Sequence, residues 1–296
     1  MFRRPAYFLV AVSNRVNLDL CLRYGLAGFP SSVNGVWAFV DVDLGDYVSF
    51  LYGARIYNLY RVVDKVALKS AEFAPPWKPL THRSGRTYCF PFRLKLKPVR
   101  EFCESLVRVE FAYIAENLLL RGGYAKSHFQ ADQTTLQCAS QLGVLWRGWV
   151  KELNLEGFDT FVPKFTLNRK FARPYEVYHL REVILQAIIR HYLSMSGNLG
   201  RFIEDIGLSG ELVSDDLEVL GEKALPEGHV DIIVKEAVPI GKARMIIIEV
   251  KLNRAGLVDL VQLDRYRSEL GRECIATCII ARNFSARTLV KARKLN

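Results

Sequence analysis

Apolar runs of strand length, each interrupted by a few charges, stand out in the second half of the chain. The run over 245–251 is apolar up to Glu249 and Lys251, which predicts a buried strand that ends in two charged groups. An earlier run over 230–234 carries one carboxylate, Asp231, near its start. Side chains two apart on a strand share a face, so Glu249 and Lys251 point the same way, and Asp231 joins them if the two runs pair as a hairpin. Two carboxylates and an ammonium at the edge of an apolar sheet can bind a divalent cation and hold a water beside it, which suits phosphodiester cleavage.

A predicted helix follows the second of these runs. Residues 256–270 have the apolar period of a helix. Asp259, Gln262 and Tyr266 fall on one of its faces, at i, i+3 and i+7. Polar groups on this face are therefore expected to extend the site formed by the two strands.

The order of these residues resembles a known nuclease pattern. It runs Gly-His-Val-Asp at 228–231, Glu-x-Lys at 249–251 and Gln-x-x-x-Tyr at 262–266. This is similar to the PD-(D/E)xK nuclease superfamily, and most resembles its RecB-like branch, which includes the archaeal mismatch-cleaving endonucleases. The resemblance covers roughly residues 176–285 and implies a restriction-endonuclease-like α/β sheet flanked by helices.

The resemblance also implies a role for each matching residue. Asp231 and Glu249 would be the ligands of a Mg²⁺ or Mn²⁺ ion. Lys251 would orient or deprotonate the attacking water and stabilise the charge that builds on the phosphate. Gln262 would hold the water or a phosphate oxygen, and Tyr266 would brace the helix or touch the nucleic-acid backbone.

A further glutamate, on a helix before the sheet, belongs to the same pattern. The sequence predicts a helix over 181–189 in which Glu182 is the only acid. Glu176 lies at the start of this segment and is the competing candidate. Glu222, which follows a predicted strand over 217–220, is another acidic neighbour. Glu182 ranks first among the three.

The first half of the chain has a different pattern, rich in aromatic and β-branched residues. An opening strand is predicted over 7–12, and a helix over 18–24. Further strands are predicted over 44–53, after a tight turn, over 54–66 and over 88–97. Together these segments predict a small mixed β-barrel with helices.

This half resembles the EVE/YTH-like branch of the PUA-like superfamily, over roughly residues 5–140. The features that carry the resemblance are the opening strand with Ser13-Asn14, Gly45-Asp46 with Phe50-Leu51-Tyr52, Trp77 in a proline-rich loop, and the strand that bears Arg93. Members of that branch read modified bases, holding a flipped nucleotide in an aromatic pocket, and an extruded base needs π-faces on both sides and polar groups at its edge.

The resemblance implies a set of pocket residues. They are Trp37 and Trp77 as walls, Ser13 and Asn14 as readers of the base edge, and Tyr57 or Tyr60 as a third wall. Trp37 lies in an apolar stretch and fits a core position equally well. Arg93 and Lys95 either follow a nucleic-acid backbone or form the solvated face of an edge strand.

The middle of the chain predicts less. Residues 102–120 have helical periodicity, and 121–129 form a loop with two glycines that lacks phosphate-binding P-loop spacing. We divide the chain into a base-reading or nucleic-acid-binding domain over 1–145, a linker over 146–175 and a nuclease domain over 176–296. The fold class expected is therefore two-domain α/β.

Composition and charge place the protein in a broad class. The chain has 296 residues, half of them hydrophobic, and a net charge of +10. Residues 1–150 hold 19 Lys and Arg against 11 Asp and Glu, whereas residues 151–296 hold 22 against 20, so the first half is the expected footprint for a polyanion. The six cysteines form no C-x-x-C pair, and no segment has the length of a signal peptide core or a membrane span. A cytoplasmic protein is expected.

Three functions follow from these patterns. The first is a metal-dependent DNA endonuclease of the restriction type, which recognises a modified base in double-stranded DNA. The second is a nuclease that cuts mismatched or branched DNA and uses its first domain only to grip the duplex or to dimerise. The third is a nucleic-acid reader that no longer cuts. One active site per chain favours a homodimer for a double-strand break.

Overall fold

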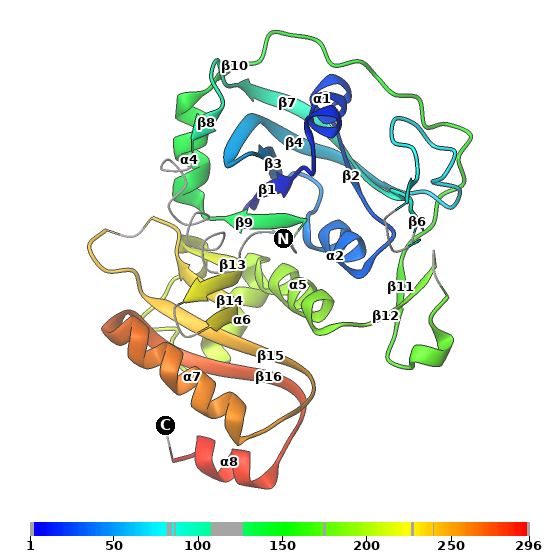
Figure 1. Ribbon diagram of the computed structural model, residues 1–296. Helices are drawn as coiled ribbons and strands as arrows, with labels where there is room; N and C mark the ends of the chain where they lie inside the picture. The colour runs from blue at the N-terminus through cyan, green and yellow to red at the C-terminus, as the bar shows by residue number, and fades with distance from the viewer. Residues whose placement is uncertain are drawn as a thin grey trace.

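Two β-sheets, one from each half of the chain, organise the computed structural model (Figure 1). The structure describes residues 3–81, 85, 87–107, 127–173, 176–225, 228–238 and 240–294. Most of the helix predicted over 102–120, and of the loop predicted over 121–129, lies outside the described residues. Figure 1 shows the N-terminal sheet above, the C-terminal sheet below, and α5 at the boundary between them.

The N-terminal sheet is mixed and open. Its described strands follow the order β10-β7-β4-β3-β1-β9, with β2 added to β7 and β8 to β4. The strands β1 and β3 are parallel, whereas β1 and β9 are antiparallel. Its strands are β1 (Tyr7–Ala11), β2 (Leu26–Phe29), β3 (Tyr47–Tyr52), β4 (Arg55–Ala67), β7 (Phe92–Glu101), β8 (Leu106–Val107), β9 (His128–Ala131) and β10 (Val144–Leu145).

The closed barrel expected for this half is not formed by the described strands. Closure would require the two outermost strands of the sheet, β10 and β9, to pair with each other. Instead, β9 lies against the second half of the chain, where the Gln130 amide donates to Val219 O at 3.0 Å and accepts from Gly221 N at 2.8 Å. The strand β9 is therefore covered by β13 (Leu217–Leu225), and the mixed strand pattern is confirmed without the barrel.

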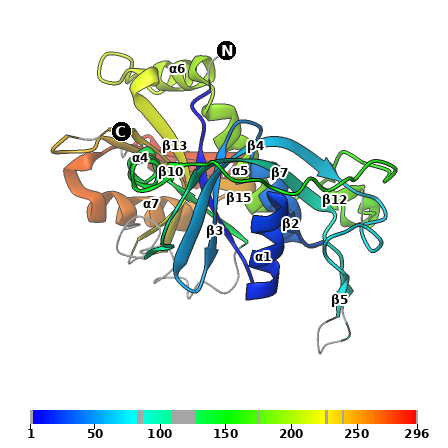
Figure 2. The same cartoon turned by 90° about the horizontal axis from the view of Figure 1, so that it is seen from above.

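Three helices accompany this sheet (Figure 2). Within the described residues they are α1 (Arg15–Tyr24), α2 (Val33–Asp41) and α4 (Gln133–Leu142). The short strands β5 (Leu80–Thr81) and β6 (Thr87–Tyr88) form a separate antiparallel pair. Asn14 caps α1 by accepting from Asn17 N, and Ser32 caps α2 by accepting from Gly35 N, as short polar side chains do at helix starts. The apolar stretch around Trp37 is thus part of a capped helix.

The C-terminal sheet has four strands in the order β13-β14-β15-β16. The first three are antiparallel neighbours, and β16 is parallel to β15 because α7 crosses over between them. The elements of this half are α5 (Glu182–Leu193), α6 (Ser196–Asp205), β13, β14 (Gly228–Glu236), β15 (Met245–Ala255), α7 (Leu257–Leu270), β16 (Cys274–Phe284) and α8 (Ala286–Ala292). The helices predicted over 181–189 and 256–270 are confirmed, and so is the general α/β class.

Both faces of this sheet are covered, which explains why its strands read as continuous apolar runs. Ile232, Ile246 and Ile248 pack with residues of α5 and α6 on one face. On the other face, Ile233 and Ile247 pack with α7. Charged groups in these strands, such as Lys235 and Glu249, are therefore buried and form ion pairs.

The segment 146–175 packs along the N-terminal half. Lys151 N donates to Arg23 O at 2.9 Å and Phe161 N to Ala67 O at 2.8 Å. The segment also forms β11 (Lys164–Thr166), which pairs with β12 (Val177–His179), and a short 3₁₀ turn at Arg169–Phe171. Two further 3₁₀ turns, at Ser214–Asp216 and Gly271–Glu273, lie in the C-terminal half. Ile184 and Ala187 of α5 belong to the N-terminal core, so the two halves share packed residues.

Among the described helices, none combines the length and the apolar run needed to cross a bilayer.

Candidate active site

The strands β14 and β15 separate at the point where Asp231 lies. The paired part of these strands ends with Ile232 opposite Ile248, so Asp231 and Glu249 are the next residues on the two strands. There the Asp231 carboxylate, rather than a backbone carbonyl, accepts the Val250 N–H at 2.7 Å. The side chain thus satisfies a backbone donor that the diverging strand leaves without a partner. The predicted hairpin therefore brings Asp231 beside Glu249.

Three carboxylates surround the Lys251 ammonium. Its Nζ lies 2.6 Å from Glu249 Oε1, 3.7 Å from Glu182 Oε1 and 3.8 Å from Asp259 Oδ1. These acids come from three elements: the same strand, the start of α5 and the start of α7. The sequence pattern placed Glu182 and Asp259 near the site, and the structure brings both to the same ammonium.

Glu182 is fixed by a second contact. Its Oε2 accepts the Leu252 N–H at 3.1 Å, which ties the first turn of α5 to β15 just after Lys251. Of the two competing acids, Glu176 is exposed and pairs with Lys69 at 3.5 Å, away from Lys251. Glu222 lines a small internal cavity with Asp231 and has a left-handed backbone, with φ of 50°.

Burial makes these acids hard to ionise. Burial, together with the neighbouring Glu249 charge, raises the pKa of Asp231 to about 7. Burial also raises the pKa of Glu249, against the opposing effect of Lys251. Burial disfavours the Lys251 ammonium, but its hydrogen bond to Glu249 and the surrounding carboxylates outweigh this and raise the pKa of Lys251. The lysine is therefore held as a cation, and the acids gain from any further positive charge.

Glu249 has the features of a cation ligand. Its side chain is 1 % exposed, and its Oε2 is buried without a hydrogen-bond partner, although a buried carboxylate oxygen is costly to leave unpaired. Hard carboxylate oxygens such as those of Asp231 and Glu249 are the ligands that Mg²⁺ and Mn²⁺ prefer. Within the described residues, three or more His, Cys, Asp or Glu side chains do not by themselves converge into a metal-binding group. Lys251 is the cation that lies among the acids in this structure.

The face of α7 predicted to carry polar groups does so. Gln262 Nε2 donates to the Tyr266 hydroxyl at 2.6 Å, and that hydroxyl donates to His229 O at 3.0 Å. Tyr266 is 1 % exposed, so it braces α7 against β14 two residues before Asp231. Burial raises the pKa of Tyr266, which keeps its hydroxyl protonated as a donor.

Gly228 makes room for this brace. Its φ is 150°, and a Cβ at this position would lie 2.6 Å from the Tyr266 hydroxyl. Only glycine combines that backbone conformation with so close an approach. The glycine of the Gly-His-Val-Asp run is thus required by the packing of Tyr266.

Replacing Gly228 with alanine is expected to lower the free energy of unfolding by roughly 2–3 kcal/mol, because the added methyl group displaces the Tyr266 hydroxyl as well as straining the backbone. Chemical denaturation followed by circular dichroism measures this loss. Gly241→Ala is the matched control, since Gly241 also has a positive φ, of 81°, but a Cβ there would meet no atom within 4 Å. Equal losses in the two variants would show that Tyr266 does not need the space.

A separate cavity lies in the N-terminal half. It has a volume of about 550 Å³ and opens between the end of β1, α1 and the start of α2. Its lining includes aromatic rings and short polar side chains: Ser13, Asn17, Asn34, Trp77, Tyr88 and Phe90. Two of the predicted pocket residues, Ser13 and Trp77, are among them. Tyr88, Phe90 and the two asparagines were not singled out from the sequence, because they come from separate segments, α1, α2 and the region of β6, that only the fold brings together.

Trp77 is more buried than its proline-rich loop suggested. It is 6 % exposed and lies on β2 over Gly28, where a Cβ would come within 2.5 Å of its ring. The Arg93 guanidinium carbon is 4.6 Å from the ring centroid, and Gly28 and Arg93 are paired across β2 and β7. The Trp77 indole thus packs against Gly28 and Arg93, which are paired on the two strands, and it also contributes to the lining of the cavity.

The other predicted pocket residues lie elsewhere. Trp37 is 7 % exposed, packs at 4.5 Å from the His128 ring and is not among the residues that line the cavity. Tyr60 is fully buried against Phe50 and cannot serve as a wall. Tyr57 is half-buried against the same core, and the Asn14 side chain is used in capping α1. The aromatic cage expected from the sequence is therefore corrected to the lining described above.

The positions expected for Arg93 and Lys95, along a nucleic-acid backbone or on an edge strand, are also corrected. Arg93 is fully buried, and its guanidinium donates to three backbone carbonyls, those of Phe90, Pro75 and Ala74, so it clamps a loop and does not reach a nucleic-acid backbone. Burial lowers the pKa of Arg93 to about 10. Lys95 pairs with Asp64 at 2.9 Å on β7, which lies between β2 and β4 and is therefore not an edge strand at this position.

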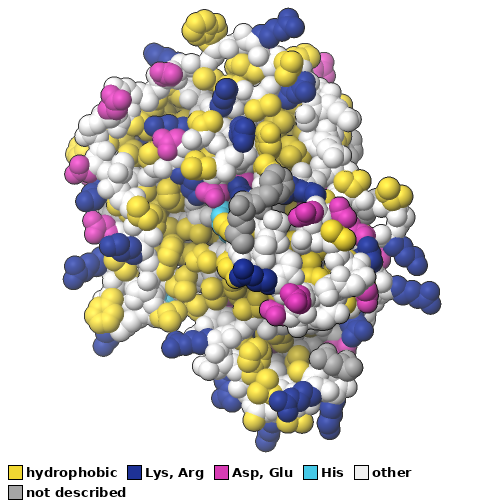
Figure 3. Space-filling view, turned by 180° about the vertical axis from the view of Figure 1, so that it is seen from behind, with side chains coloured by type: hydrophobic (Ala, Val, Ile, Leu, Met, Phe, Trp, Pro, Cys, Tyr) yellow, Lys and Arg dark blue, Asp and Glu magenta, His cyan; other side chains and the backbone are white. Residues whose placement is uncertain are grey.

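The surface charge does not single out the N-terminal half. On the face drawn in Figure 3, Lys and Arg side chains are scattered over the upper and lower parts of the molecule instead of forming one patch. The surplus of positive charge in residues 1–150 therefore does not define a nucleic-acid footprint on that face.

Family models and curated proteins give no relative for this chain. No protein-family model matches it, and no curated protein is significantly similar to it. The resemblance of the chain to a nuclease therefore rests on its own residues and on the site that they form.

Proposed function

We propose that this protein is a metal-dependent DNA endonuclease that cuts with the centre formed by Asp231, Glu249 and Lys251. The convergence of these three side chains carries the proposal, since the buried Glu249 carboxylate, the half-buried Asp231 carboxylate and the Lys251 ammonium meet where two strands of an apolar sheet diverge. Buried charges of this kind destabilise a protein unless they serve a purpose, and strongly perturbed acids are frequent at catalytic sites. The sheet flanked by helices agrees with the architecture that the nuclease resemblance implies.

Each residue then has a defined task. Asp231 and Glu249 would hold the cation, which when bound activates a water and polarises the phosphate. Lys251, kept charged by its acidic neighbours, would donate to the phosphate oxygen on which negative charge develops, and is not the base that deprotonates the water. Tyr266 and Gln262 would keep α7 in place beside the site, and Glu182 would orient Lys251.

A cleavage panel tests the proposal. Purified full-length protein is incubated with plasmid, genomic and synthetic duplex DNA, and with RNA, in Mg²⁺, in Mn²⁺ and in EDTA. Cation-dependent nicking or cutting of DNA is expected. Protein that binds Mn²⁺ but cuts nothing would point to a reader that has lost its activity, and cutting confined to mismatched or branched duplexes would favour a repair nuclease.

We further propose that the N-terminal cavity receives a modified base of the DNA substrate. Its volume of about 550 Å³ exceeds that of a single nucleobase, and it offers aromatic surface from Phe90 and Tyr88 together with amide groups at Asn17 and Asn34. These are the groups that hold a base taken out of the stack and read its edge. Cleavage by the C-terminal centre would then depend on what this cavity holds.

Blocking the cavity from its rim tests this part without disturbing the core. Ser13→Trp is expected to lower the preference for modified over unmodified DNA to near unity, while the rate on unmodified DNA stays within about twofold. The measurement is cleavage of genomic DNAs that differ in methylation. Val16→Trp is the matched control, because Val16 is 68 % exposed in the first turn of α1, three residues after Ser13, and does not line the cavity. An unchanged preference in Ser13→Trp would remove the base-reading role. Trp77→Ala is unsuitable, because loss of this buried ring would cost about 3–5 kcal/mol of stability.

A further inference from the structure

A buried ion cluster joins the two halves of the chain. Asp41, the last residue of α2, accepts from Arg190 Nε at 2.7 Å through Oδ1 and from His128 Nε2 at 2.9 Å through Oδ2. Arg190 also donates from Nη2 to the Asp41 backbone carbonyl at 2.5 Å. Asp41, His128 and Arg190 are 6 %, 2 % and 1 % exposed. Such a cluster is costly to bury, and it links residues 149 positions apart in the sequence.

The contact between Arg190 and Asp41 depends on the shape of the guanidinium. Two different nitrogens of Arg190 bond to two different oxygens of the same residue, one on its side chain and one on its backbone. This two-point grip fixes the direction of the arginine as well as its distance, which the single ammonium of a lysine cannot do. The end of α2 thereby fixes the position of α5.

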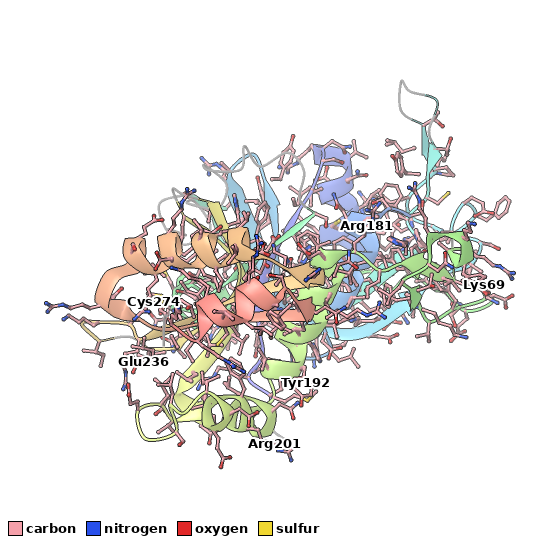
Figure 4. The ribbon with its side chains drawn as sticks, turned by 90° about the horizontal axis from the view of Figure 1, so that it is seen from below. Lys69, Arg181, Tyr192, Arg201, Glu236 and Cys274 are labelled. Carbon is pink, nitrogen blue, oxygen red and sulfur yellow. The ribbon has the colours of Figure 1, made fainter. Side chains whose placement is uncertain are left out.

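The helix α5 carries this constraint to the candidate active site. Arg190 follows Glu182 by two turns, about 12 Å along the helix axis. Figure 4 labels Arg181 and Tyr192, which lie just outside these two residues at the ends of α5. Arg181, the N-cap residue, makes no side-chain capping bond, so the first turn of α5 is held by Glu182, by the packing of Ile184 in the N-terminal core and by the rest of the helix. A shift of α5 at Arg190 would therefore move Glu182 relative to Leu252 and Lys251.

We propose that Asp41 and Arg190 are positioning residues for Glu182, so that the N-terminal half of the chain holds the cleavage centre in its working geometry. This inference rests on the proposed nuclease function for its catalytic consequence. Neither residue touches the reacting atoms. Both act through α5, whose Glu182 orients the strand that carries Lys251.

The same cluster also reaches the N-terminal cavity. Ser32 and Asn34, at the start of α2, line that cavity, and Asp41 is at the other end of the same helix. Ser127, another lining residue, donates to Asn34 O at 3.2 Å, and the next residue is His128. The cavity and the cleavage centre thus lie at the two ends of one continuous set of contacts, through α2, Asp41, Arg190 and α5.

The test uses full-length Arg190→Lys, which keeps the charge but loses the two-point grip. The first readout is amide exchange at Leu252, because the Leu252 N–H donates to Glu182 and reports its position without any metal or substrate. Exchange at Leu252 is expected to be about 10-fold faster than in the wild type. The dissociation constant for Mn²⁺ is expected to rise about 3- to 10-fold, and kcat for DNA cleavage to fall with little change in KM.

Two comparisons separate positioning from a general loss of stability. Arg3→Lys is the matched control, since the Arg3 side chain also donates to a buried aspartate, Asp46 at 2.6 Å, and to a backbone carbonyl, that of Leu44, whereas its bridge to Met195, just beyond α5, uses only its backbone. It should lower the free energy of unfolding without changing exchange at Leu252. Glu182→Ala removes the acceptor of the Leu252 N–H and so gives the largest acceleration of exchange that loss of this contact can cause. In the double variant Glu182→Ala with Arg190→Lys, the Leu252 amide should exchange no faster than in Glu182→Ala alone.

Additive effects of the two substitutions, or equal acceleration in Arg3→Lys, would overturn the inference and leave the cluster as a structural link between the halves. Unchanged exchange in Arg190→Lys would also overturn it. A wild-type protein that neither binds Mn²⁺ nor cuts DNA would instead end the proposed function, and exchange at Leu252 would still decide whether Arg190 positions Glu182.

Discussion

Asp231→Asn is expected to reduce cation-dependent DNA cleavage by at least ~10²–10³-fold and, at the same time, to make the metal-free protein more stable. Asparagine keeps an oxygen that can accept the Val250 N–H, so the backbone contact at 2.7 Å is retained. It loses the negative charge that would hold the cation. Cleavage rates in Mg²⁺ and Mn²⁺, together with thermal unfolding in EDTA, measure the two effects.

The stability gain follows from the sign of the pKa shift. Burial and the charge of Glu249 raise the pKa of Asp231 from its usual 3.8 to about 7. Between these two values the folded protein retains a proton that the unfolded chain has released, so stability falls as the pH rises through this window. Above this pH window, Asp231 is ionised in both the folded and the unfolded state, and the folded state bears the full free-energy cost of burying the charge. Asp231→Asn escapes this cost, and a gain on the order of 1–3 kcal/mol is expected at pH 8, shrinking toward pH 4.

Divalent cations should reverse the order of stability of the two proteins, so that the wild type becomes more stable than Asp231→Asn. Mn²⁺ is expected to bind the folded wild type and to raise its melting temperature, whereas Asp231→Asn should respond little. Glu218, whose pKa burial also raises to about 7, is present in both proteins and cancels from the difference. Glu269→Gln, an exposed change on α7, is the control for loss of a single charge. Wild-type cleavage rates in Asp231→Asn, or a gain in stability over the wild type that is no larger at pH 8 than at pH 4, would remove Asp231 from the centre.

Lys251→Met is expected to lower kcat for DNA cleavage by about 10²–10³-fold while leaving KM nearly unchanged, because the ammonium acts on charge that develops only during the reaction. Methionine keeps the length of the side chain, so the packing of β15 is conserved. Single-turnover cleavage over a range of DNA concentrations separates kcat from KM. Lys242→Met, at an exposed loop position, controls for the loss of one positive charge.

Lys251→Arg separates the two tasks that this lysine was assigned. Arginine keeps the positive charge but does not accept a proton, since its pKa is above 12. The raised pKa of Lys251 predicts that charge is what matters, so Lys251→Arg should retain more activity than Lys251→Met. Equal and complete loss in both variants would favour a lysine that acts as the base.

Much of the candidate site was predictable because it is built from neighbouring segments. Asp231 and Glu249 lie on consecutive strands, so alternation along each strand and a single turn between them were enough to bring them together. Asp259 and Tyr266 followed from the period of α7, whereas Glu182 followed from the nuclease resemblance, which implies a glutamate on the helix before the sheet. The predicted base pocket was less accurate, because it depended on side chains from several distant elements.

The sequence by itself determined the faces: which positions on each strand and helix are apolar, and where an acid or a lysine interrupts them. Only the tertiary structure decided which partner covers each face. It left the N-terminal sheet open with β9 against β13, buried Trp77 over Gly28, and turned Arg93 from an expected surface cation into an internal clamp. It also joined Asp41 to Arg190, which no local pattern links. Periodicity reports how a segment meets its immediate neighbours, whereas these contacts depend on how elements far apart in the chain pack against one another.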